Sequence, residues 1–166
     1  MRVDQFDFDL PEDRIALRPS DPRDAARLLL VDKGALSDRH VGDLPGLLRP
    51  GDCLVFNDTR VIPAQLEGRR GNAKIGATLH KRIDARRWQA FVRNARRVRP
   101  GEVIDFGNGV EGLAEARGED GSLTLRFLGD EPVEQLLARA GAMPLPPYIA
   151  SKRPTDARDA EDYQTM

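Results

Sequence analysis

Cysteine and histidine are scarce in this 166-residue sequence, which contains one cysteine and two histidines. A single cysteine, Cys53, excludes an intrachain disulfide and a metal site built from several cysteines. His40 and His80 have no cysteine or histidine partner at the spacing of a metal site. We therefore expect neither a disulfide nor a bound metal, which fits a reducing cytosol.

Long apolar runs are also missing. None approaches the ~20 residues that a membrane helix needs. The first residues, MRVDQFDFDLPEDRI, have three aspartates before Pro11, where a signal peptide would have an apolar core. The absence of a Walker loop and of a G-x-S-x-G motif argues against a nucleoside triphosphate hydrolase and a triad hydrolase. The sequence predicts a cytoplasmic protein with no membrane partner.

Charges balance over the whole chain but not along it. The chain has 26 lysines and arginines against 27 acids, yet residues 69–99 contain eleven cationic residues and one acid, Asp84. That segment carries +10, whereas residues 101–150 carry −6. Clustered cations of one sign bind the phosphates of nucleic acids, and the alternative is a solvated charged face. We favour nucleic-acid binding.

Turn signals and β-forming residues divide the chain into three parts. Residues 1–62 indicate mixed α and β structure, with a short helix after Pro11, a strand over Leu28–Val31 before a Lys33-Gly34 turn, and a short helix near Asp43–Leu48. Arg23 and Arg27, four residues apart, are expected to share a helix face, where an ion-pair cluster with Asp24 is favoured over a phosphate or carboxylate site.

The middle part is rich in short β-forming runs. Residues 63–140 contain many such runs between glycine-, asparagine- and arginine-rich breaks, among them the alternating Leu123, Leu125 and Phe127. This pattern predicts a small antiparallel β-barrel or β-sandwich, followed by a helix with Asp130 as its cap. Trp88 and Phe91 lie among the cationic residues; they could stack on bases, but we favour the barrel core. Residues 141–166 are a proline-rich and then polar segment.

The stretch CLVFNDTR raises the question of a functional site. Cys53–Phe56 is apolar and is expected to be a buried strand, with Cys53 as a small core residue. Asn57, Asp58, Thr59 and Arg60 follow at its carboxyl end, where α/β folds gather their functional side chains. An arginine there can bind a carboxylate or phosphate with two hydrogen bonds. The alternative is an ordinary turn with a local pair between Asp58 and Arg60, and the residues alone do not separate the two.

Five stretches, in order, carry a family resemblance. They are DFDLPEDRIA, DPRDAARLL, RPGDCLVFNDTRVIPAQL, MPLPPYI and DYQTM. Together they resemble the amino-terminal half of the S-adenosylmethionine:tRNA ribosyltransferase-isomerase family of the queuosine pathway. The resemblance covers essentially the whole chain and is weakest across the β-rich middle. At Gln65 that family more often has an arginine.

The resemblance implies a fold class, α+β or α/β: part of an α/β-barrel-like domain (residues 1–62, with a return segment at 141–166) and an inserted small antiparallel β-barrel domain (63–140). It implies transfer and isomerisation of the ribosyl moiety of S-adenosylmethionine onto 7-aminomethyl-7-deazaguanine at the tRNA wobble position, which gives epoxyqueuosine and releases adenine and methionine. S-adenosylmethionine is then a substrate, and no cofactor or metal is expected. The protein is expected to be a monomer.

The resemblance also suggests which residues bind the substrates. Asp58 and Arg60 are expected to contact substrate, with Asn57 and Thr59 in support, and the catalytic base is not assigned. The candidates for tRNA contacts are Arg86, Arg87, Arg93, Arg96 and Arg97.

One departure from the family concerns length. Members of the family are substantially longer, so we expect this chain to be a truncated form that is inactive by itself. The alternative function is a tRNA-binding module without catalysis, and a weaker one is an α+β scaffold with a basic surface.

Overall fold

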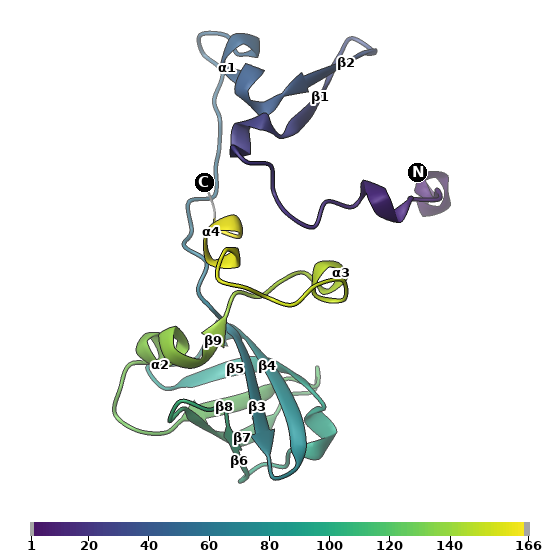
Figure 1. Cartoon of the computed structure of the whole chain (residues 1–166). Coiled ribbons are helices and arrows are strands. Elements are labelled where there is room, and N and C mark those ends of the chain that lie inside the picture. Colours follow the sequence, from purple (N-terminus) through teal and green to yellow (C-terminus); the bar gives the residue numbers. More distant parts are fainter. Residues whose placement is uncertain (1, 165–166) are drawn as a thin grey trace. The chain divides into compact units, whose positions relative to one another are not determined.

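The computed structural model describes residues 2–164 (Figure 1). The chain divides into two compact units, unit 1 (Met1–Asn57) and unit 2 (Asp58–Met166). Each unit is described by itself below. The domain assignment drawn from the sequence stays a prediction.

Unit 1 is built around one β-hairpin. Strands β1 (Arg27–Asp32) and β2 (Ala35–His40) pair antiparallel, and Lys33 and Gly34 turn between them with positive φ angles of 49° and 88°. The strand and turn expected here are confirmed. The short helix expected near Asp43–Leu48 is also confirmed, as the single turn η4 (Val41–Asp43) followed by α1 (Leu44–Leu47).

Two expectations for the start of unit 1 are wrong. The helix expected after Pro11 is only the 3-10 turn η2 (Glu12–Arg14), between the similar turns η1 (Val3–Phe6) and η3 (Arg23–Ala25). Arg23 and Arg27 do not share a helix face, because η3 ends before β1 begins at Arg27. Short helices are marginal unless tertiary packing covers one face, and none of residues 2–57 is buried.

The expected buried strand at Cys53–Phe56 is wrong too. The segment has no regular structure, and Cys53 is exposed. Leu54, Val55 and Phe56 are 47%, 90% and 66% exposed. A strand needs a neighbour that takes up its backbone hydrogen bonds, and no strand within residues 2–164 pairs with this segment. An apolar run alone was therefore insufficient evidence for a strand.

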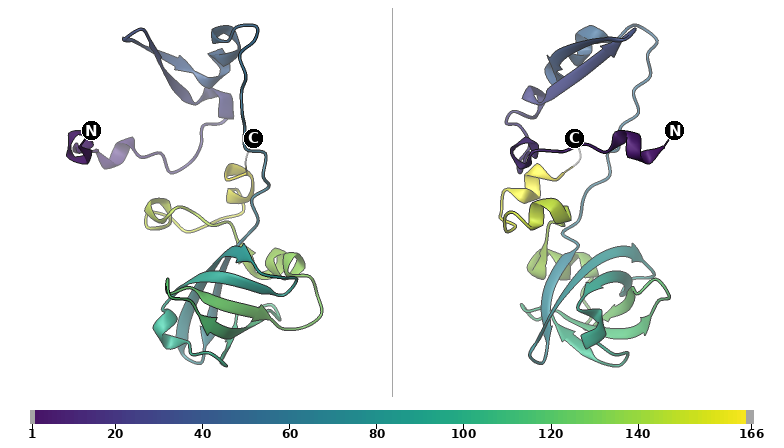
Figure 2. Two further views of the ribbon diagram at one scale, coloured as in Figure 1. Left: turned by 180° about the vertical axis from the view of Figure 1, so that it is seen from behind. Right: turned by 90° about the vertical axis from the view of Figure 1, so that its right-hand side faces the viewer.

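Unit 2 contains a closed antiparallel β-barrel of six strands (Figure 2). The strands follow the order β4-β5-β8-β7-β6-β3, and β3 pairs back with β4 to close the barrel. Their bounds are β3 Gln65–Arg70, β4 Ala73–Arg82, β5 Arg87–Arg93, β6 Val103–Asp105, β7 Glu111–Arg117 and β8 Leu123–Phe127. The expected small antiparallel barrel is confirmed. Every strand pair in residues 2–164 is antiparallel. These pairs do not confirm the α/β-barrel-like part of the expected fold, which stays a prediction.

Alternate residues of the strands fill the barrel. Leu123, Leu125 and Phe127 of β8 are at most 1% exposed, as their spacing predicts. Trp88 is 9% exposed and belongs to the core, but Phe91 is 55% exposed and stacks on His80 with 4.1 Å between ring centroids. Core placement is therefore confirmed for Trp88 and wrong for Phe91, which lies on the opposite face of β5.

A helix covers one end of the barrel. Helix α2 (Val133–Ala140) buries Val133, Leu136 and Leu137 in the barrel core, and the short strand β9 (Gly141–Ala142) then pairs with β3 (Figure 1). Pro132 is the N-cap, so the expected cap at Asp130 is wrong; this carboxylate accepts a hydrogen bond from Arg86 at 2.6 Å instead. The remaining elements of unit 2 are η5 (Ala95–Arg97), α3 (Pro147–Ala150) and α4 (Asp159–Asp162).

Candidate functional site

Two of the distinctive sequence stretches meet in unit 2. The side-chain oxygen of Gln164 accepts a hydrogen bond from the Val61 amide at 3.1 Å, and the Gln164 amide donates to the Val61 carbonyl at 3.0 Å. Gln164 belongs to DYQTM, whose last two residues lie outside the described residues, and Val61 belongs to RPGDCLVFNDTRVIPAQL. Residues that are 103 positions apart are thus joined by a two-point contact.

A cavity of about 890 Å³ lies beside this contact. The segment after Arg60 forms one wall, the α2–β9 connection forms a second, and the approach to α4 forms a third. Much of the wall is apolar, from Ile62, Pro63 and Met143, while Arg60 supplies a cation. The full lining is Arg60, Val61, Ile62, Pro63, Glu134, Ala138, Gly141, Ala142, Met143, Thr155, Asp156, Ala157, Ala160 and Gln164.

Charges of both signs line this cavity. Arg60 is exposed, so its guanidinium is open to a ligand. Glu134 and Asp156 are the two acids of the lining; Glu134 lies 3.4 Å from Arg82, and Asp156 accepts a hydrogen bond from the Arg158 amide at 3.0 Å. A cavity of this kind suits a ligand that has an apolar body, an anionic group and a cationic group.

A buried ion pair holds the wall next to α4. Asp159 is fully buried and accepts hydrogen bonds from Arg153 at 2.9 Å and 2.5 Å. It also accepts one from the Asp156 amide at 2.8 Å. The hydrogen bonds that Arg153 donates to Asp159 raise the pKa of the Arg153 guanidinium. Bidentate pairs of this type fix geometry as well as charge, so Thr155 and Asp156 have a defined position in the cavity wall.

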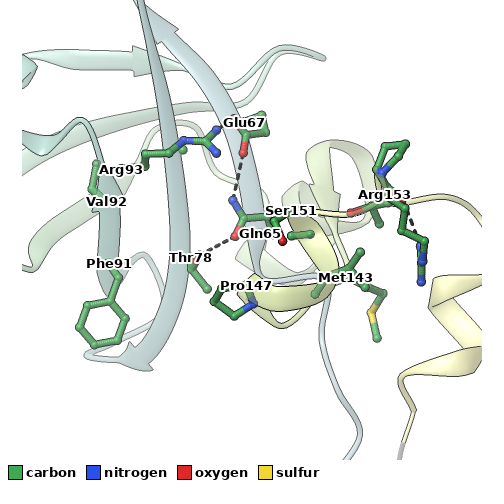
Figure 3. Close-up of a pocket in the computed structure, with 15 residues that line it drawn as sticks. Gln65, Glu67, Thr78, Phe91, Val92, Arg93, Met143, Pro147, Ser151 and Arg153 are labelled. Atoms are coloured by element: carbon green, nitrogen blue, oxygen red, sulfur yellow. Dashed lines mark hydrogen bonds and ion pairs between the residues drawn. The ribbon is translucent and has the colours of Figure 1, made fainter. Parts of the chain in front are cut away.

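A second cavity, of about 750 Å³, lies on the outside of the barrel between β3, β4, β5 and the α3 segment (Figure 3). Gln65 accepts a hydrogen bond from Thr78 at 2.5 Å and donates to Glu67 at 3.1 Å. Glu67 in turn binds Arg93 at 2.6 Å. Because these polar groups satisfy one another, we give this cavity less weight than the one at Arg60.

The four residues expected at the substrate site differ in their placement. Asn57 is the last residue of unit 1, and Asp58, Thr59 and Arg60 begin unit 2. All four are exposed and lie in irregular structure, and Arg60 is the one that lines the 890 Å³ cavity. No ion pair joins Asp58 to Arg60 within the described part of the chain, so the local pair that the turn alternative requires does not form there. The substrate-contact role of the four residues stays a prediction.

The five arginines expected at the tRNA surface fall into two groups. Arg86, Arg87 and Arg93 are paired with Asp130, Asp84 and Glu67, each at 2.6 Å. Arg96 and Arg97, both in η5, are exposed and have no carboxylate partner among residues 2–164. The sequence showed the excess of positive charge but not which cations are neutralised, because two of the three pairing carboxylates, Asp130 and Glu67, lie 44 and 26 positions from their arginines.

Some sequence patterns carry no site. A G-x-G-x-x-G spacing occurs at Gly107, Gly109 and Gly112, but it lies at the turn between β6 and β7 and not between a strand and a helix, so it lacks the context of a dinucleotide site. Within residues 2–164, no group of three or more histidine, cysteine or acidic side chains is placed to hold a metal ion. No helix in the same range has both the length and the apolar character for crossing a membrane.

Comparison with known proteins then decides the family. The model of the family described as "Queuosine biosynthesis protein" matches residues 3–166. The chain belongs to the queuosine biosynthesis protein family. This confirms the resemblance read from the five sequence stretches.

Several members of the queuosine biosynthesis protein family are similar to the chain over its whole length. A protein of Rhizorhabdus wittichii named S-adenosylmethionine:tRNA ribosyltransferase-isomerase is 74% identical, over 100% of this chain and 49% of that protein. Proteins of the same name from Sphingopyxis alaskensis and Zymomonas mobilis are 74% and 58% identical, over 100% of this chain and 47% and 48% of those proteins. The chain therefore spans about half the length of these relatives.

A solved structure is also similar in sequence. The crystal structure of an S-adenosylmethionine tRNA ribosyltransferase from Thermotoga maritima is 35% identical and covers 74% of this chain and 44% of that one, with a TM-score of 0.39. A score of that size carries no conclusion on how the elements are arranged.

Proposed function

We propose that this chain acts as the amino-terminal half of an S-adenosylmethionine:tRNA ribosyltransferase-isomerase. The observation that carries the proposal is that relatives of this name match all of the chain at up to 74% identity. The reaction moves the ribosyl moiety of S-adenosylmethionine onto 7-aminomethyl-7-deazaguanine at the tRNA wobble position and gives epoxyqueuosine. S-adenosylmethionine is a substrate, no cofactor or metal takes part, and the protein acts as a cytoplasmic monomer.

The chemistry follows from the sulfonium group of S-adenosylmethionine. The positive sulfur acidifies the adjacent ribose carbon, so a base removes a proton there and leaves an ylide. The carbanion forms a double bond to the next ribose carbon and breaks the bond from that carbon to the ring oxygen; the oxygen becomes an aldehyde oxygen and expels adenine, which departs with the electrons of its bond to the sugar. The aminomethyl nitrogen adds to the double bond and loses a proton, which regenerates the ylide. The ylide carbon attacks the aldehyde, and the resulting alkoxide displaces methionine as the carbon–sulfur bond breaks and the epoxide closes. The protein must hold two large substrates in register and stabilise the developing charges.

The cavity at Arg60 has the chemistry to bind S-adenosylmethionine. Its apolar walls suit the adenine ring and the methionine chain, and Arg60 can bind the methionine carboxylate with two hydrogen bonds. Glu134 and Asp156 supply negative charge for the ammonium and the sulfonium. We assign Arg60 to the carboxylate, with Asp58 as a second substrate contact and Asn57 and Thr59 in support.

The alternative of a tRNA-binding module without catalysis is not favoured, because the relatives that match the whole chain are named as enzymes. Since the chain spans about half of their length, we expect no adenine release when this chain is assayed alone with S-adenosylmethionine and substrate tRNA.

A chimera tests the function. This chain replaces the matching half of the Rhizorhabdus wittichii protein, and adenine release is followed with S-adenosylmethionine and tRNA that carries the aminomethyl base. We expect turnover within about tenfold of the unaltered protein, because the chain is 74% identical to the half that it replaces. A folded chimera that releases no adenine contradicts the proposal.

Variants of Arg60 test the site within the same chimera. Arg60→Ala is expected to raise the KM for S-adenosylmethionine by about 10- to 100-fold, since a charge-assisted pair contributes about 1.5–3 kcal/mol. Arg60→Lys keeps the charge but loses the two-point geometry, so it should recover only part of the loss. An unchanged KM in both variants removes Arg60 from the site.

A further inference from the structure

Lys74, Arg96 and Arg97, which have no carboxylate partner within the described residues 2–164, lie toward the end of the barrel opposite α2. There the β3–β4 hairpin turns at Gly71 and Asn72, while β9 pairs with the start of β3 at the other end (Figure 1). At the α2 end, cationic side chains face acids: Arg82 pairs with Glu134, Arg86 with Asp130 and Arg87 with Asp84. The positive charge of residues 69–99 is therefore unevenly compensated over the barrel.

A small cavity lies at the hairpin end. It measures about 270 Å³ and is lined by Asn72, Ala73, Lys74, Asn94 and Arg97. Two of these side chains are cationic, two are amides and none is acidic. Lys74 and Arg97 have no carboxylate partner among residues 2–164. With two positive charges, two amide groups and no acid, the lining suits an anionic phosphate group.

The backbone around this cavity is held in place. Asn94 has a left-handed conformation, with φ of 63°, and its side-chain amide donates to the Lys74 carbonyl at 2.9 Å. This bond ties the start of η5, and with it Arg97, to strand β4. On the other side of η5, Arg117 donates to the carbonyls of Ala95 and Val98 at 2.7 Å and 3.1 Å. The site is thus preorganised, which lowers the entropic cost of binding an anion.

We infer that the cavity formed by Asn72, Lys74, Asn94 and Arg97 is a binding site for a phosphodiester group of an RNA backbone. Lys74 and Arg97 neutralise the phosphate, and the two asparagine side chains contribute hydrogen bonds. Arg96 in η5, exposed beside the cavity, is placed for a neighbouring phosphate. The choice of RNA over a free phosphate rests on the proposed function, in which tRNA is a substrate, and on Arg96, a further exposed cation next to Arg97 in η5.

The inference divides the five arginines expected at the tRNA surface into those near the proposed phosphate site and those already paired with carboxylates. Arg97 belongs to the site, together with Lys74, which had not been singled out in the sequence, and Arg96 is the neighbouring residue of Arg97 in η5. Arg86, Arg87 and Arg93 are already paired with carboxylates, so their contribution to RNA binding is expected to be smaller.

A pair of double variants tests the site in the chain as it exists. Lys74→Ala with Arg97→Ala removes two charges from the cavity. Lys81→Ala with Arg82→Ala is the matched control, because it removes two charges from the other end of β4. Affinity for an unmodified tRNA transcript is measured at several salt concentrations, and Trp88 fluorescence confirms that each variant is folded.

We expect the cavity variant to bind tRNA about tenfold more weakly than the parent chain. The slope of log affinity against log salt should fall by about 0.7–0.9, since one neutralised phosphate contributes that much. The control variant should stay within about threefold of the parent. Equal losses in both variants, or no loss in the cavity variant, would overturn the site.

Two further outcomes separate this inference from the proposed function. If inorganic phosphate at constant ionic strength shifts the amide NMR signals of Asn72 and Asn94 while tRNA affinity is the same in all variants, the cavity takes free phosphate and the RNA assignment is wrong. If the parent chain binds no tRNA, the inference fails whatever the chimera does. Adenine release by the chimera tests the enzymatic function independently, so either proposal can fail alone.

Discussion

The two units differ sharply in how far they bury their apolar side chains. Unit 1 exposes Leu29, Val31 and Leu36 of its hairpin at 60%, 62% and 68%, and it buries none of residues 2–57. Unit 2 places alternate residues of six strands inside a closed barrel. Both units contain β-forming sequence, so composition does not explain the difference. A two-stranded hairpin has no second layer to cover its apolar face, whereas a closed barrel supplies that layer itself.

The same comparison explains where the candidate sites lie. The cavity at Arg60 and the small cavity lined by Lys74, Asn94 and Arg97 are both in unit 2. There, neighbouring strands and the Arg153–Asp159 pair hold side chains in fixed positions. Rigid elements position functional groups more accurately than isolated hairpins do. Four predictions test the contrast, and each compares a change in unit 2 with a matched change in unit 1.

The largest effect is expected from the barrel core. Phe127 is 1% exposed and its ring lies 6.3 Å from that of Phe106. Phe127→Ala should lower the free energy of unfolding of the barrel by about 3–5 kcal/mol. Phe8→Ala, at a position 73% exposed in unit 1, should change it by no more than about 0.5 kcal/mol. Urea unfolding followed by the fluorescence of Trp88, the one tryptophan of the chain, reports the barrel directly. Similar effects of the two substitutions would remove the contrast.

The second prediction concerns two glycines. A β-carbon at Gly141 would lie 2.1 Å from the Pro63 carbonyl oxygen and 2.6 Å from that of Leu137, whereas one at Gly46 in α1 would have no atom within 4 Å. Gly141→Ala should therefore cost about 1–3 kcal/mol, because backbone must move to relieve the overlap. Gly46→Ala should leave the Trp88 unfolding transition unchanged. A neutral Gly141→Ala would show that the α2–β9 connection is loosely packed.

The third prediction concerns the contact between Gln164 and Val61. Gln164→Ala removes both hydrogen bonds and should weaken local stability by about 1–2 kcal/mol. The amide of Val61 should then exchange with solvent about 5- to 30-fold faster. Gln5→Ala in unit 1 is the control and should leave that exchange rate unchanged. Unaltered exchange in the Gln164 variant would mean that the contact does not hold the segment.

The smallest expected effect is on the stability of the barrel, and its pH dependence becomes visible only at acidic pH. The amides of Arg86 and Arg87 and the Arg87 guanidinium hydrogen-bond to Asp84, and they lower the pKa of this carboxyl from 3.8 to about 2. Because the folded-state pKa is depressed, the stabilisation is fully present above pH 3.8 and is lost as the pH falls through about 2.

A substitution series isolates this carboxylate. Asp84→Asn should lower barrel stability at neutral pH, and the difference from the parent should shrink as the pH falls from 4 toward 2. Asp38→Asn in unit 1, at an exposed carboxylate 3.5 Å from Arg27, should leave the Trp88 transition unchanged at every pH. A difference that stays constant down to pH 2 would contradict the lowered pKa.

Local patterns in the sequence were sufficient for several elements. Lys33-Gly34 marks the hairpin turn, the alternation of Leu123, Leu125 and Phe127 marks a barrel strand, and Leu136 and Leu137 mark the buried face of α2. These elements are decided by backbone preferences and by a period that holds over a few residues.

Local patterns failed where a distant partner decides the outcome. Cys53–Phe56 has the composition of a buried strand, but no strand within residues 2–164 pairs with it. Phe91 resembles a core residue by type, yet the register of β5 places it on the outer face, against His80. In a strand the side chains alternate between faces, so a shift of one position exchanges core and surface.

The sequence by itself determined the family, the existence of the barrel and the excess of positive charge in residues 69–99. Only the tertiary structure decided which of those cations are neutralised, that Gln164 binds Val61, and that Lys74, Asn94 and Arg97 share one cavity. The reason is physical: composition and periodicity act between near neighbours, whereas ion pairs and cavities depend on distances between residues that the closure of the barrel brings together.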